Sequence, residues 1–499
     1  MKKNFKWLLL VSLTFAACSD DDTTTTEAVA EVPVTAGTAD FSNYVALGNS
    51  LTAGYSDGAL YKSGQEVSWT KILSDQFALA GGGEFKIPYV NDNFGGLTLG
   101  GTVITENRLY LKTINDDGTA ASPAPTRLPG TPTTDILNHL TGPFNNMGVP
   151  GAKSFHLVAP GYGNVQGVPT GASNPYFVRF ASSASATVLG DAVAQNPTFF
   201  TLWIGNNDIL SYATTGGIGV NQLTNPNPAT YGANDITNPQ VFENVYGALL
   251  TQLTANGAKG AVANIPYVTS IPYFTRVPYN AVPLDGATAG ALNSGFAAYN
   301  GGLAVAQNAG LITAAEKTRR TINFTAGQNA VTIEDSYLTN LGGLGLPSYR
   351  QATAEDLIIL PASSFIGTAV GGNPQAINGV SVPLADNWVL SKDEAAEVKT
   401  AADAFNRSIK TLAEAKGLAF VDANALLGAV NSGGVPYEQY ILTSEFVFGG
   451  AFSLDGVHPT GRGYALIANE FAKAINAKYG STLPTVKLTN YPVLRPKNL

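Results

Sequence analysis

The chain has 499 residues, 44% of them hydrophobic and 13% charged, with a formal net charge of −8 at pH 7. This length suffices for one large domain with insertions or for two domains. No basic run or stripe is available to displace counterions from a phosphate backbone, which argues against nucleic acid as a partner. The single cysteine excludes an intramolecular disulfide and a cluster of thiolate metal ligands.

Residues 1–17 have the form of a removable export signal, because lysines open the segment and an apolar stretch too short to span a bilayer follows. The sequence from Phe15 to Cys18, Phe-Ala-Ala-Cys, resembles the cleavage box of bacterial lipoproteins, although Phe15 stands where leucine is usual. We therefore expect an exported protein that is anchored to the bacterial outer membrane by a lipid on Cys18. An ordinary export signal with an incidental cysteine is the alternative.

Residues 18–40 begin with a polar tract of aspartates and threonines and are predicted to be a disordered tether, because such a composition cannot bury enough surface to fold. The acidic residues directly after the cysteine resemble the surface-export signal of lipoproteins from Bacteroidota. A solvated spacer is the alternative. The sequence therefore leaves open which face of the outer membrane the protein occupies.

Downstream of the tether, short apolar runs alternate with helical periodicities, which is typical of an α/β domain with a parallel sheet. The run at about 43–49 is predicted to be the first strand, and apolar side chains at helical spacing predict a helix over about 66–80. Residues 81–140, rich in Gly, Thr and Pro, are predicted to be a first insertion. Within it, a turn signal at 115–118 separates two short strands.

A compact motif from Asn146 to Gly151 follows the first insertion. The chain then predicts a helix at 185–195, a strand at 199–204, a helix at 239–255 and a strand at 260–265. Residues 270–390 hold Ala/Gly-rich stretches and Pro/Gly loops and are predicted to be a second, larger insertion. The last predicted elements are a helix that a capping box of Ser391 and Glu394 begins, a strand at 418–422, a helix at about 460–478 and a C-terminal extension at 481–499.

Two polar motifs directly follow predicted strands: residues 48–51 read Gly-Asn-Ser-Leu, and residues 205–208 read Gly-Asn-Asn-Asp. In parallel α/β sheets, ligands bind beyond the carboxyl ends of the strands. Ser50 and Asn207 are therefore expected at one edge of the sheet.

A third motif, Asp-Gly-Val-His at 455–458, precedes the final helix. A serine hydroxyl is a poor nucleophile until a base takes its proton. Of the three histidines, only His458 has a carboxylate three residues before it. A serine at a strand end and a histidine oriented by a carboxylate are the groups that acyl transfer requires.

The order of these motifs resembles that of the SGNH, or GDSL-type, hydrolases over the whole mature chain. The resemblance implies a three-layer α/β/α, flavodoxin-like fold with about five parallel strands, and a hydrolase domain over 41–480 that carries the two insertions. It implies a serine hydrolase, an esterase or lipase, that cleaves carboxylic esters without a cofactor or a metal.

The resemblance also implies a role for each site residue. Ser50 is expected to be the nucleophile, His458 the base, and Asp455 the carboxylate that orients the base. The oxyanion hole is expected to consist of Ser50, Gly151 and Asn207. Asn49 departs from the family pattern, which usually has aspartate before the nucleophile. Gly148 is the competing choice to Gly151 as the glycine of the oxyanion hole.

The substrate stays open among lipid acyl esters, acetylated glycans and short-chain esters of no defined role. The apolar stretch 357–361 is either a lid over an acyl chain or a buried strand. His139 and His156 are expected to have structural roles, and a place in the cleft is the alternative for His156. No pair of histidines has metal-ligand spacing with a third ligand nearby, so no metal is expected. A non-catalytic ligand-binding lipoprotein on the same fold is the alternative function, and the sequence does not determine the oligomeric state.

Overall fold

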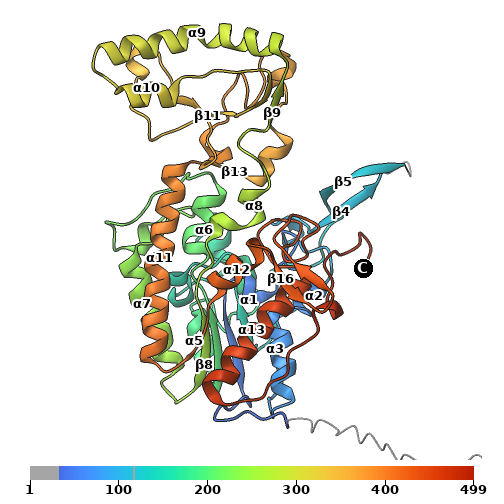
Figure 1. The fold of residues 1–499 in the computed structure, drawn as a ribbon. Helices are drawn as coiled ribbons and strands as arrows, with labels where there is room; N and C mark the ends of the chain where they lie inside the picture. Colours follow the sequence, from blue (N-terminus) through green and yellow to red (C-terminus); the bar gives the residue numbers. More distant parts are fainter. Residues whose placement is uncertain (1–32, 116–118) are drawn as a thin grey trace, which may run out of the picture. The chain divides into compact units, whose positions relative to one another are not determined.

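A central parallel sheet organises the fold in the computed structural model, which describes residues 33–115 and 119–499 (Figure 1). In spatial order the strands are β15, β8, β7, β1 and β6, and every neighbouring pair is parallel. Their bounds in that order are Ala419–Val421, Lys259–Ala263, Phe199–Trp203, Tyr44–Gly48 and Asn146–Gly148. The predicted α/β class with about five parallel strands is confirmed.

The strands form because their side chains are buried on both faces of the sheet. All five residues of β1 and all five of β7 are buried. In β1, Val45 and Leu47 belong to the core on one face, whereas Tyr44 and Ala46 belong to the core on the other. Continuous apolar runs of this kind are typical of parallel strands that helices cover on both sides.

Helices α3 (Trp69–Ala78) and α13 (Gly461–Tyr479) pack together on one face of the sheet. The rings of Trp69 and Phe471 stack there with their centroids 4.2 Å apart. This contact holds the first long helix of the domain against the last one.

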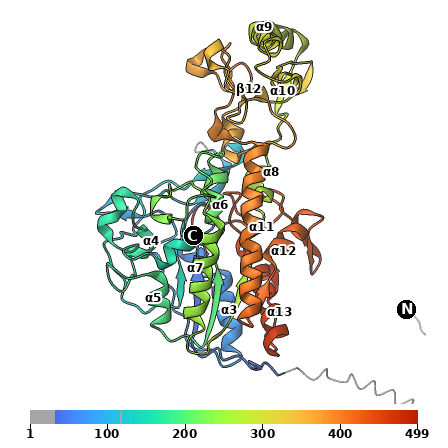
Figure 2. The same cartoon turned by 90° about the vertical axis from the view of Figure 1, so that its left-hand side faces the viewer.

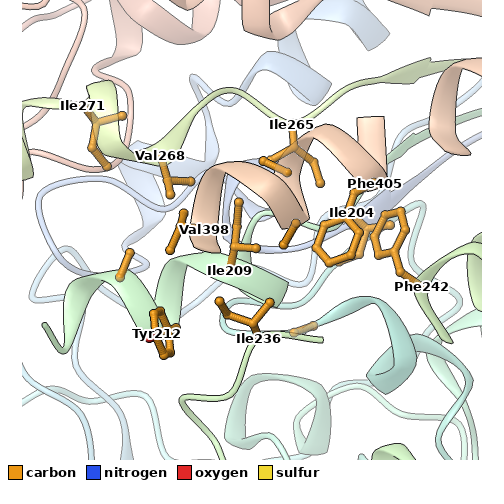
Figure 3. Close-up of a cluster of buried hydrophobic side chains, with 14 of the residues drawn as sticks. Ile204, Ile209, Tyr212, Ile236, Phe242, Ile265, Val268, Ile271, Val398 and Phe405 are labelled. Atoms are coloured by element: carbon orange, nitrogen blue, oxygen red, sulfur yellow. The ribbon is translucent and has the colours of Figure 1, made fainter. Parts of the chain in front are cut away.

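The opposite face of the sheet is covered by α5 (Val188–Val193), α7 (Pro239–Leu253) and α11 (Lys392–Ala415) (Figure 2). Phe242 of α7 stacks on Phe405 of α11 at a centroid distance of 4.2 Å, within the cluster of buried side chains in Figure 3. Each face of the sheet therefore has its own apolar core.

Most predicted elements lie within a few residues of the observed ones. Helix α3 begins three residues later than predicted because Ser68 caps it, its hydroxyl accepting the N–H of Lys71. Helix α11 begins at the predicted capping box of Ser391 and Glu394. The sequence did not predict β6, because a three-residue strand that starts with a polar residue lacks an apolar run, nor α12 (Ala423–Asn431), a short helix directly after β15.

Between α3 and β6, at the predicted first insertion, the chain forms two antiparallel strand pairs. These are β2 (Thr98–Leu99) with β3 (Thr102–Val103), and β4 (Leu109–Ile114) with β5 (Ala120–Arg127). Strands β4 and β5 flank the predicted turn, of which residues 116–118 lie outside the described residues.

Between β8 and α11, at the predicted second insertion, helices and small strand pairs alternate. The helices are α8 (Pro272–Thr275), α9 (Gly286–Asn308) and α10 (Ala314–Arg320). The antiparallel pairs are β9 (Val282–Leu284) with β10 (Gly327–Asn329), β11 (Thr332–Glu334) with β12 (Tyr349–Gln351), and β13 (Leu357–Ile358) with β14 (Val389–Leu390). In stretch 357–361, Leu357–Ile358 form β13 with Ile358 fully buried, as the buried-strand interpretation predicts, whereas Leu360 and the exposed Pro361 begin a 3-10 helix.

Other short elements lie near the sheet or at the ends of the long helices. They are α1 (Ser50–Ala53), α2 (Lys62–Gln65), α4 (Pro175–Val178), α6 (Asn207–Thr214), β16 (Val435–Tyr437) and β17 (Tyr440–Leu442).

The end of the predicted tether belongs to the folded domain. Thr35 and Thr482 exchange backbone and side-chain hydrogen bonds, and the N–H of Thr38 donates to the carbonyl of Tyr479 at 2.8 Å. The tether prediction is therefore wrong over its last residues, because pairing with the end of α13 orders them. Residues 1–17, Cys18 and the tether up to residue 32 lie outside the described residues.

The predicted extension at 481–499 packs on the domain. Leu483 and Leu488 are buried, and the side chain of Arg108 donates to the carbonyl of Pro496 at 2.7 Å. Among the described residues, none of the helices combines the length and the apolar character that crossing a bilayer requires.

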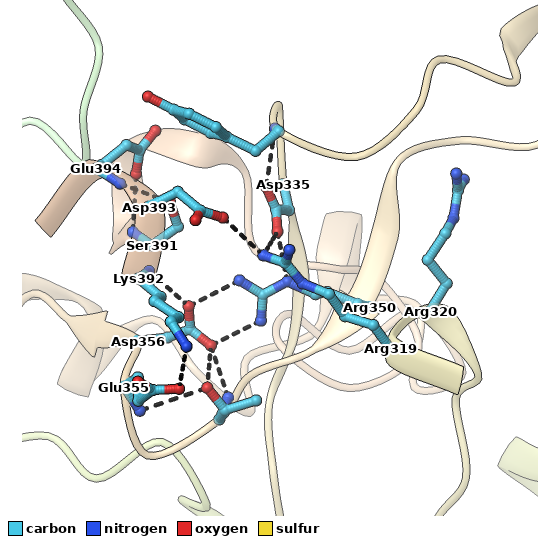
Figure 4. Close-up of polar contacts among 12 residues, drawn as sticks. Arg319, Arg320, Asp335, Arg350, Glu355, Asp356, Ser391, Lys392, Asp393 and Glu394 are labelled. Atoms are coloured by element: carbon cyan, nitrogen blue, oxygen red, sulfur yellow. Dashed lines mark hydrogen bonds and ion pairs between the residues drawn. The ribbon is translucent and has the colours of Figure 1, made fainter. Parts of the chain in front are cut away.

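A buried cluster of ion pairs joins the second insertion to the start of α11 (Figure 4). The guanidinium of Arg350 in β12 lies 2.5 Å from Asp335 and 2.6 Å from Asp356. Asp356 also accepts the backbone N–H of Lys392, the first residue of α11, at 3.0 Å. Burial by itself would raise the pKa of Asp356, but the bonds to Arg350 hold it below its ordinary value.

We expect Arg350→Ala to lower the free energy of unfolding by about 3–5 kcal/mol, because it leaves a buried carboxylate at Asp356 without its cation. The matched control is Lys392→Ala, which removes an exposed ion pair with Glu355 and costs less than about 1 kcal/mol. Urea denaturation followed by tryptophan fluorescence measures both variants. Equal losses in the two variants would contradict the conclusion that the buried ion pairs of Arg350 contribute more stability than an exposed pair.

Candidate active site

Ser50 is the first residue of the short helix α1, directly beyond the carboxyl end of β1. Strand β1 ends in Gly48, where a Cβ atom would collide with Thr52 Oγ1 and with the carbonyl oxygen of Trp203. Asn49 caps α1 by accepting the N–H of Leu51 at 3.0 Å. As the first helical residue, Ser50 has a backbone N–H without an acceptor inside its own helix.

Ser50, His458 and Asp455 are connected by two hydrogen bonds. Ser50 Oγ lies 2.9 Å from His458 Nε2, and His458 Nδ1 lies 2.8 Å from Asp455 Oδ2. The loop before α13 carries both the histidine and the aspartate, and Ser50 comes from the opposite end of the chain. The structure therefore brings together the three residues predicted as nucleophile, base and orienting carboxylate.

The carboxylate of Asp455 accepts several hydrogen bonds besides the one from the His458 imidazole. Its Oδ1 accepts the backbone N–H groups of Val457 and His458, both at 2.8 Å, and the hydroxyl of Ser453 at 3.1 Å. Its Oδ2 also accepts the N–H of Gly58 at 2.8 Å. Burial would raise the pKa of Asp455, but the interaction with His458 and these hydrogen bonds lower it to about 2. Asp455 is therefore ionised at neutral pH.

Asn207 begins α6 beyond the carboxyl end of β7 and lines the same cavity as Ser50 and His458. Its Nδ2 donates to the carbonyl of Ala152 at 2.9 Å, which ties α6 to the loop after β6. An amide nitrogen carries two hydrogens, so a second donor remains for a ligand. Asn207 is thus placed beside the serine, as predicted.

Gly151 is an exposed residue in the loop after β6, between the buried Pro150 and Ala152. This loop reaches the serine turn, because the N–H of Val149 donates to the carbonyl of Gly48 at 3.0 Å. Within the part of the chain that the structure describes, the N–H of Gly151 has no acceptor. The N–H of the competing Gly148 already donates to Asn146 Oδ1 at 2.9 Å. Of the two glycines, only Gly151 therefore has a backbone donor to offer.

The side chain of Asn49 makes two hydrogen bonds. Besides capping α1, its Nδ2 donates to Asn206 Oδ1 at 3.1 Å. This bond joins the turn after β1 to the turn after β7. An aspartate at position 49 has no such donor, so it would require the amide of Asn206 to reverse.

The sequence did not predict several residues that surround the site. Asn206 pairs with Asn49, and the ring of Tyr55 lies 4.6 Å from the imidazole of His458. Gly58 and Ser453 both donate to Asp455. One signal was available, since the Asp-Gly pair at 57–58 is typical of a tight hairpin turn.

An apolar cavity of about 110 Å³ opens beside Ser50 and His458. Its polar lining comes from the serine, the histidine, Asn206 and Asn207. The walls are apolar and include Leu210, Val268, Leu427, Val430, Phe452 and Leu466. Helix α12, which the sequence did not predict, thus forms one wall of the cavity.

The other two histidines have structural surroundings, as predicted. His139 Nε2 lies 2.9 Å from the carbonyl oxygen of Ala181. His156 accepts the N–H of Lys153 at Nδ1, and its ring stacks on Tyr162 at a centroid distance of 4.6 Å. Within residues 33–115 and 119–499, no three His, Cys, Asp or Glu side chains group as metal ligands would.

A scan against protein-family models, a search of curated proteins and a search of solved structures each found no match to this chain. The chemistry of the site therefore rests on the geometry of the chain's own residues.

His156 should make the fold sensitive to acid. Burial, with a smaller contribution from Lys153, lowers the pKa of His156 to about 4. In the unfolded chain a histidine titrates near 6.5, so between these values the unfolded state binds more protons and the free energy of unfolding falls as the pH decreases. His156→Phe keeps a ring against Tyr162 but cannot be protonated.

We therefore expect the variant to gain about 2–3 kcal/mol relative to the wild type between pH 7 and pH 4.5. Urea denaturation at both pH values measures this difference. The same difference in free energy of unfolding at both pH values would contradict a lowered pKa for His156.

Proposed function

We propose that the protein is a carboxylic ester hydrolase of the SGNH type, with Ser50 as its nucleophile. The observation that carries this proposal is the hydrogen-bonded series from Ser50 Oγ through His458 to Asp455 at the carboxyl edge of the parallel sheet. Numbered along the chain, the strand order β6-β1-β7-β8-β15 reads 2-1-3-4-5, which supports the flavodoxin-like description with helices as outer layers.

In the proposed mechanism, His458 Nε2 takes the proton of Ser50 as Oγ attacks the ester carbonyl. Asp455, ionised at neutral pH, orients the imidazole and stabilises the imidazolium that forms. The new oxyanion accepts hydrogen bonds from the backbone N–H groups of Ser50 and Gly151 and from the side chain of Asn207. Loss of one such donor costs on the order of 10²–10³ in turnover in comparable hydrolases.

The tetrahedral intermediate then collapses, and the bond between the carbonyl carbon and the alcohol oxygen breaks. His458 gives its proton to the leaving alcohol, which leaves the acyl group on Ser50. Water attacks this acyl-enzyme with His458 again acting as base, and the carboxylic acid is released. Each proton taken by the histidine is returned, so no cofactor is required.

Ser50→Ala should abolish ester hydrolysis and labelling by a fluorophosphonate probe, because the attacking oxygen is gone.

Asp455→Asn should lower kcat by about 10⁴ while the protein stays folded, because the imidazole is then held in the wrong tautomer. Hydrolysis of p-nitrophenyl esters and mass spectrometry of the labelled protein measure both effects.

Two results would count against the proposal. Full activity in the Ser50→Ala variant would remove the serine from the mechanism. Folded wild-type protein that forms no adduct at Ser50 would favour the alternative function, a non-catalytic surface protein that binds a ligand in the same cavity.

The apolar cavity supports esters of longer acyl chains, such as those of lipids, over acetylated glycans as the substrate class. An acetyl group needs little apolar volume, whereas each buried methylene contributes about 0.8 kcal/mol to binding. The cavity walls beside Ser50 are built mainly from aliphatic side chains of α6, α12 and α13, with Phe452 added from the segment before α13. The predicted export signal and Cys18 support a location at the bacterial outer membrane, where acyl esters of lipids are abundant.

We expect kcat/KM to rise from the acetate to the hexanoate ester by up to about fourfold per methylene, until the cavity is filled. Val430→Trp should lower activity on the longer esters but not on the acetate, because Val430 lines the cavity. The matched control is Ala429→Trp, on the same helix but exposed.

A series of p-nitrophenyl esters compared with acetate release from acetylated xylan measures this preference. Faster acetate release from xylan than hydrolysis of any longer p-nitrophenyl ester would contradict the preference for longer acyl chains.

A further inference from the structure

Residues 56–59 form a tight turn next to Asp455. Ser56 and Ala59 exchange both backbone hydrogen bonds, at 3.1 and 3.0 Å. Asp57 and Gly58 between them have φ values of +52° and +75°. Positive φ at both central residues is the mark of a type I′ turn, for which Asp-Gly is a preferred pair. The local sequence therefore specifies this turn without help from the rest of the fold.

The two central backbone donors of the turn are connected to the carboxylate of Asp455, one directly and one through the hydroxyl of Ser453. The N–H of Gly58 donates to Asp455 Oδ2 at 2.8 Å. The N–H of Asp57 donates to Ser453 Oγ at 2.9 Å, and that hydroxyl donates to Asp455 Oδ1 at 3.1 Å. Each carboxylate oxygen thus receives a hydrogen bond that begins in the turn, and Oδ2 is the oxygen bonded to His458.

The side chain of Asp57 holds the same loop from a second direction. Asp57 is 2% exposed, and its Oδ1 accepts the backbone N–H of Leu454 at 3.1 Å. Its Oδ2 accepts the hydroxyl of Tyr61 at 2.8 Å. The backbone of Asp57 binds residue 453 and its carboxylate binds residue 454, directly before the aspartate of the triad.

A buried carboxylate is a costly way to accept two hydrogen bonds. Burial, the largest cause, raises the pKa of Asp57 to about 6, although the bonds from Leu454 and Tyr61 oppose the shift. Asparagine would accept the N–H of Leu454 at a lower desolvation cost. Buried groups with shifted pKa values gather at functional sites, which points to a role beyond folding.

We propose that the Asp57-Gly58 turn positions the Asp455 carboxylate against His458, and that Asp57 is thereby a positioning residue. This inference rests on the ester hydrolysis proposed above. A shift of the carboxylate by a fraction of an ångström moves the imidazole away from Ser50 Oγ, and a misplacement of about 1 Å costs roughly 10²-fold in rate. Asp57 does not line the cavity, so it acts through the triad and not through substrate binding.

Three substitutions at position 57 separate the functions of its backbone and its side chain. Asp57→Asn tolerates positive φ and keeps an acceptor for Leu454 but loses the charge. Asp57→Gly keeps the turn and its N–H donor but loses both side-chain bonds. Asp57→Ala loses the side-chain bonds and disfavours positive φ.

We expect kcat to fall least in the asparagine variant, further in the glycine variant, and by about tenfold or more in the alanine variant. KM should change by less than about twofold, because no group that contacts the substrate is altered. The assay uses p-nitrophenyl butyrate at a temperature where circular dichroism shows each variant folded. Asp135→Asn is the matched control, since that carboxylate also accepts backbone N–H groups in a turn but does not contact Asp455. It should leave kcat unchanged.

The pH profile separates a positioning role from a loss of folded protein. A smaller folded fraction lowers the whole profile but does not move its acid limb along the pH axis. The titratable and charged groups around Asp57 are Tyr61, Asp455 and Arg108, together with Tyr464 and Arg495, which line the same small pocket. Removing the negative charge of Asp57 disfavours the imidazolium form of the base. The acid limb of kcat/KM should therefore move to lower pH in Asp57→Asn and stay in place in Asp135→Asn.

Ser453→Ala provides a second route should the alanine variant at position 57 fail to fold. It removes the bridge between the turn and Asp455 Oδ1 and should lower kcat by several-fold with KM unchanged. Folded variants at positions 57 and 453 with wild-type kcat and an unmoved acid limb would overturn the positioning role. The proposed function would survive that result as long as the wild type hydrolyses the ester and Ser50→Ala does not. A wild type without esterase activity would overturn both.

Discussion

The hydrogen bond between Ser50 Oγ and His458 Nε2 is the contact on which the other features of the site depend. It joins residues 408 positions apart at a distance of 2.9 Å. Such a bond exists only if the first strand and the last helix of the domain are placed independently and accurately. The parallel sheet and the stacking of Trp69 on Phe471 between α3 and α13 provide that placement.

Polar contacts between turns complete the carboxyl edge of the sheet. The Asn49–Asn206 bond joins the turns after β1 and β7, and the bond from Asn207 to Ala152 joins the turn after β7 to the loop after β6. These hydrogen bonds therefore fix the position of each turn relative to the next one. A donor set held this way needs little rearrangement when negative charge develops on a bound carbonyl, which is the condition for electrostatic stabilisation of an oxyanion.

The site combines an ionised carboxylate with an apolar cavity, and the two are kept apart. Asp455 does not line the cavity and accepts hydrogen bonds from backbone N–H groups and from Ser453, whereas Leu427 and Val430 of α12 line the cavity beside the serine. The hydrogen bonds keep the charge on Asp455 stable despite burial. In the proposed mechanism, an acyl chain that lies along these apolar walls excludes water beside Ser50, which strengthens the electrostatic interactions there.

Local sequence was enough to predict the elements whose signal is contained in a few neighbouring residues. The apolar runs at β1, β7 and β8 and the capping box of α11 are of this kind. The carboxylate three residues before His458 was likewise enough to single out this histidine as the candidate base. What depended on tertiary structure lacked any such signal. Strand β6 is a strand because Asn146–Gly148 pairs with β1, and Thr35 is ordered because Thr482 binds it. The choice of Gly151 over Gly148 depends on which N–H group the fold has already used, and the cavity wall depends on where α12 packs. Periodicity and capping report local backbone preference, whereas pairing, burial and the use of donors depend on residues distant in the chain.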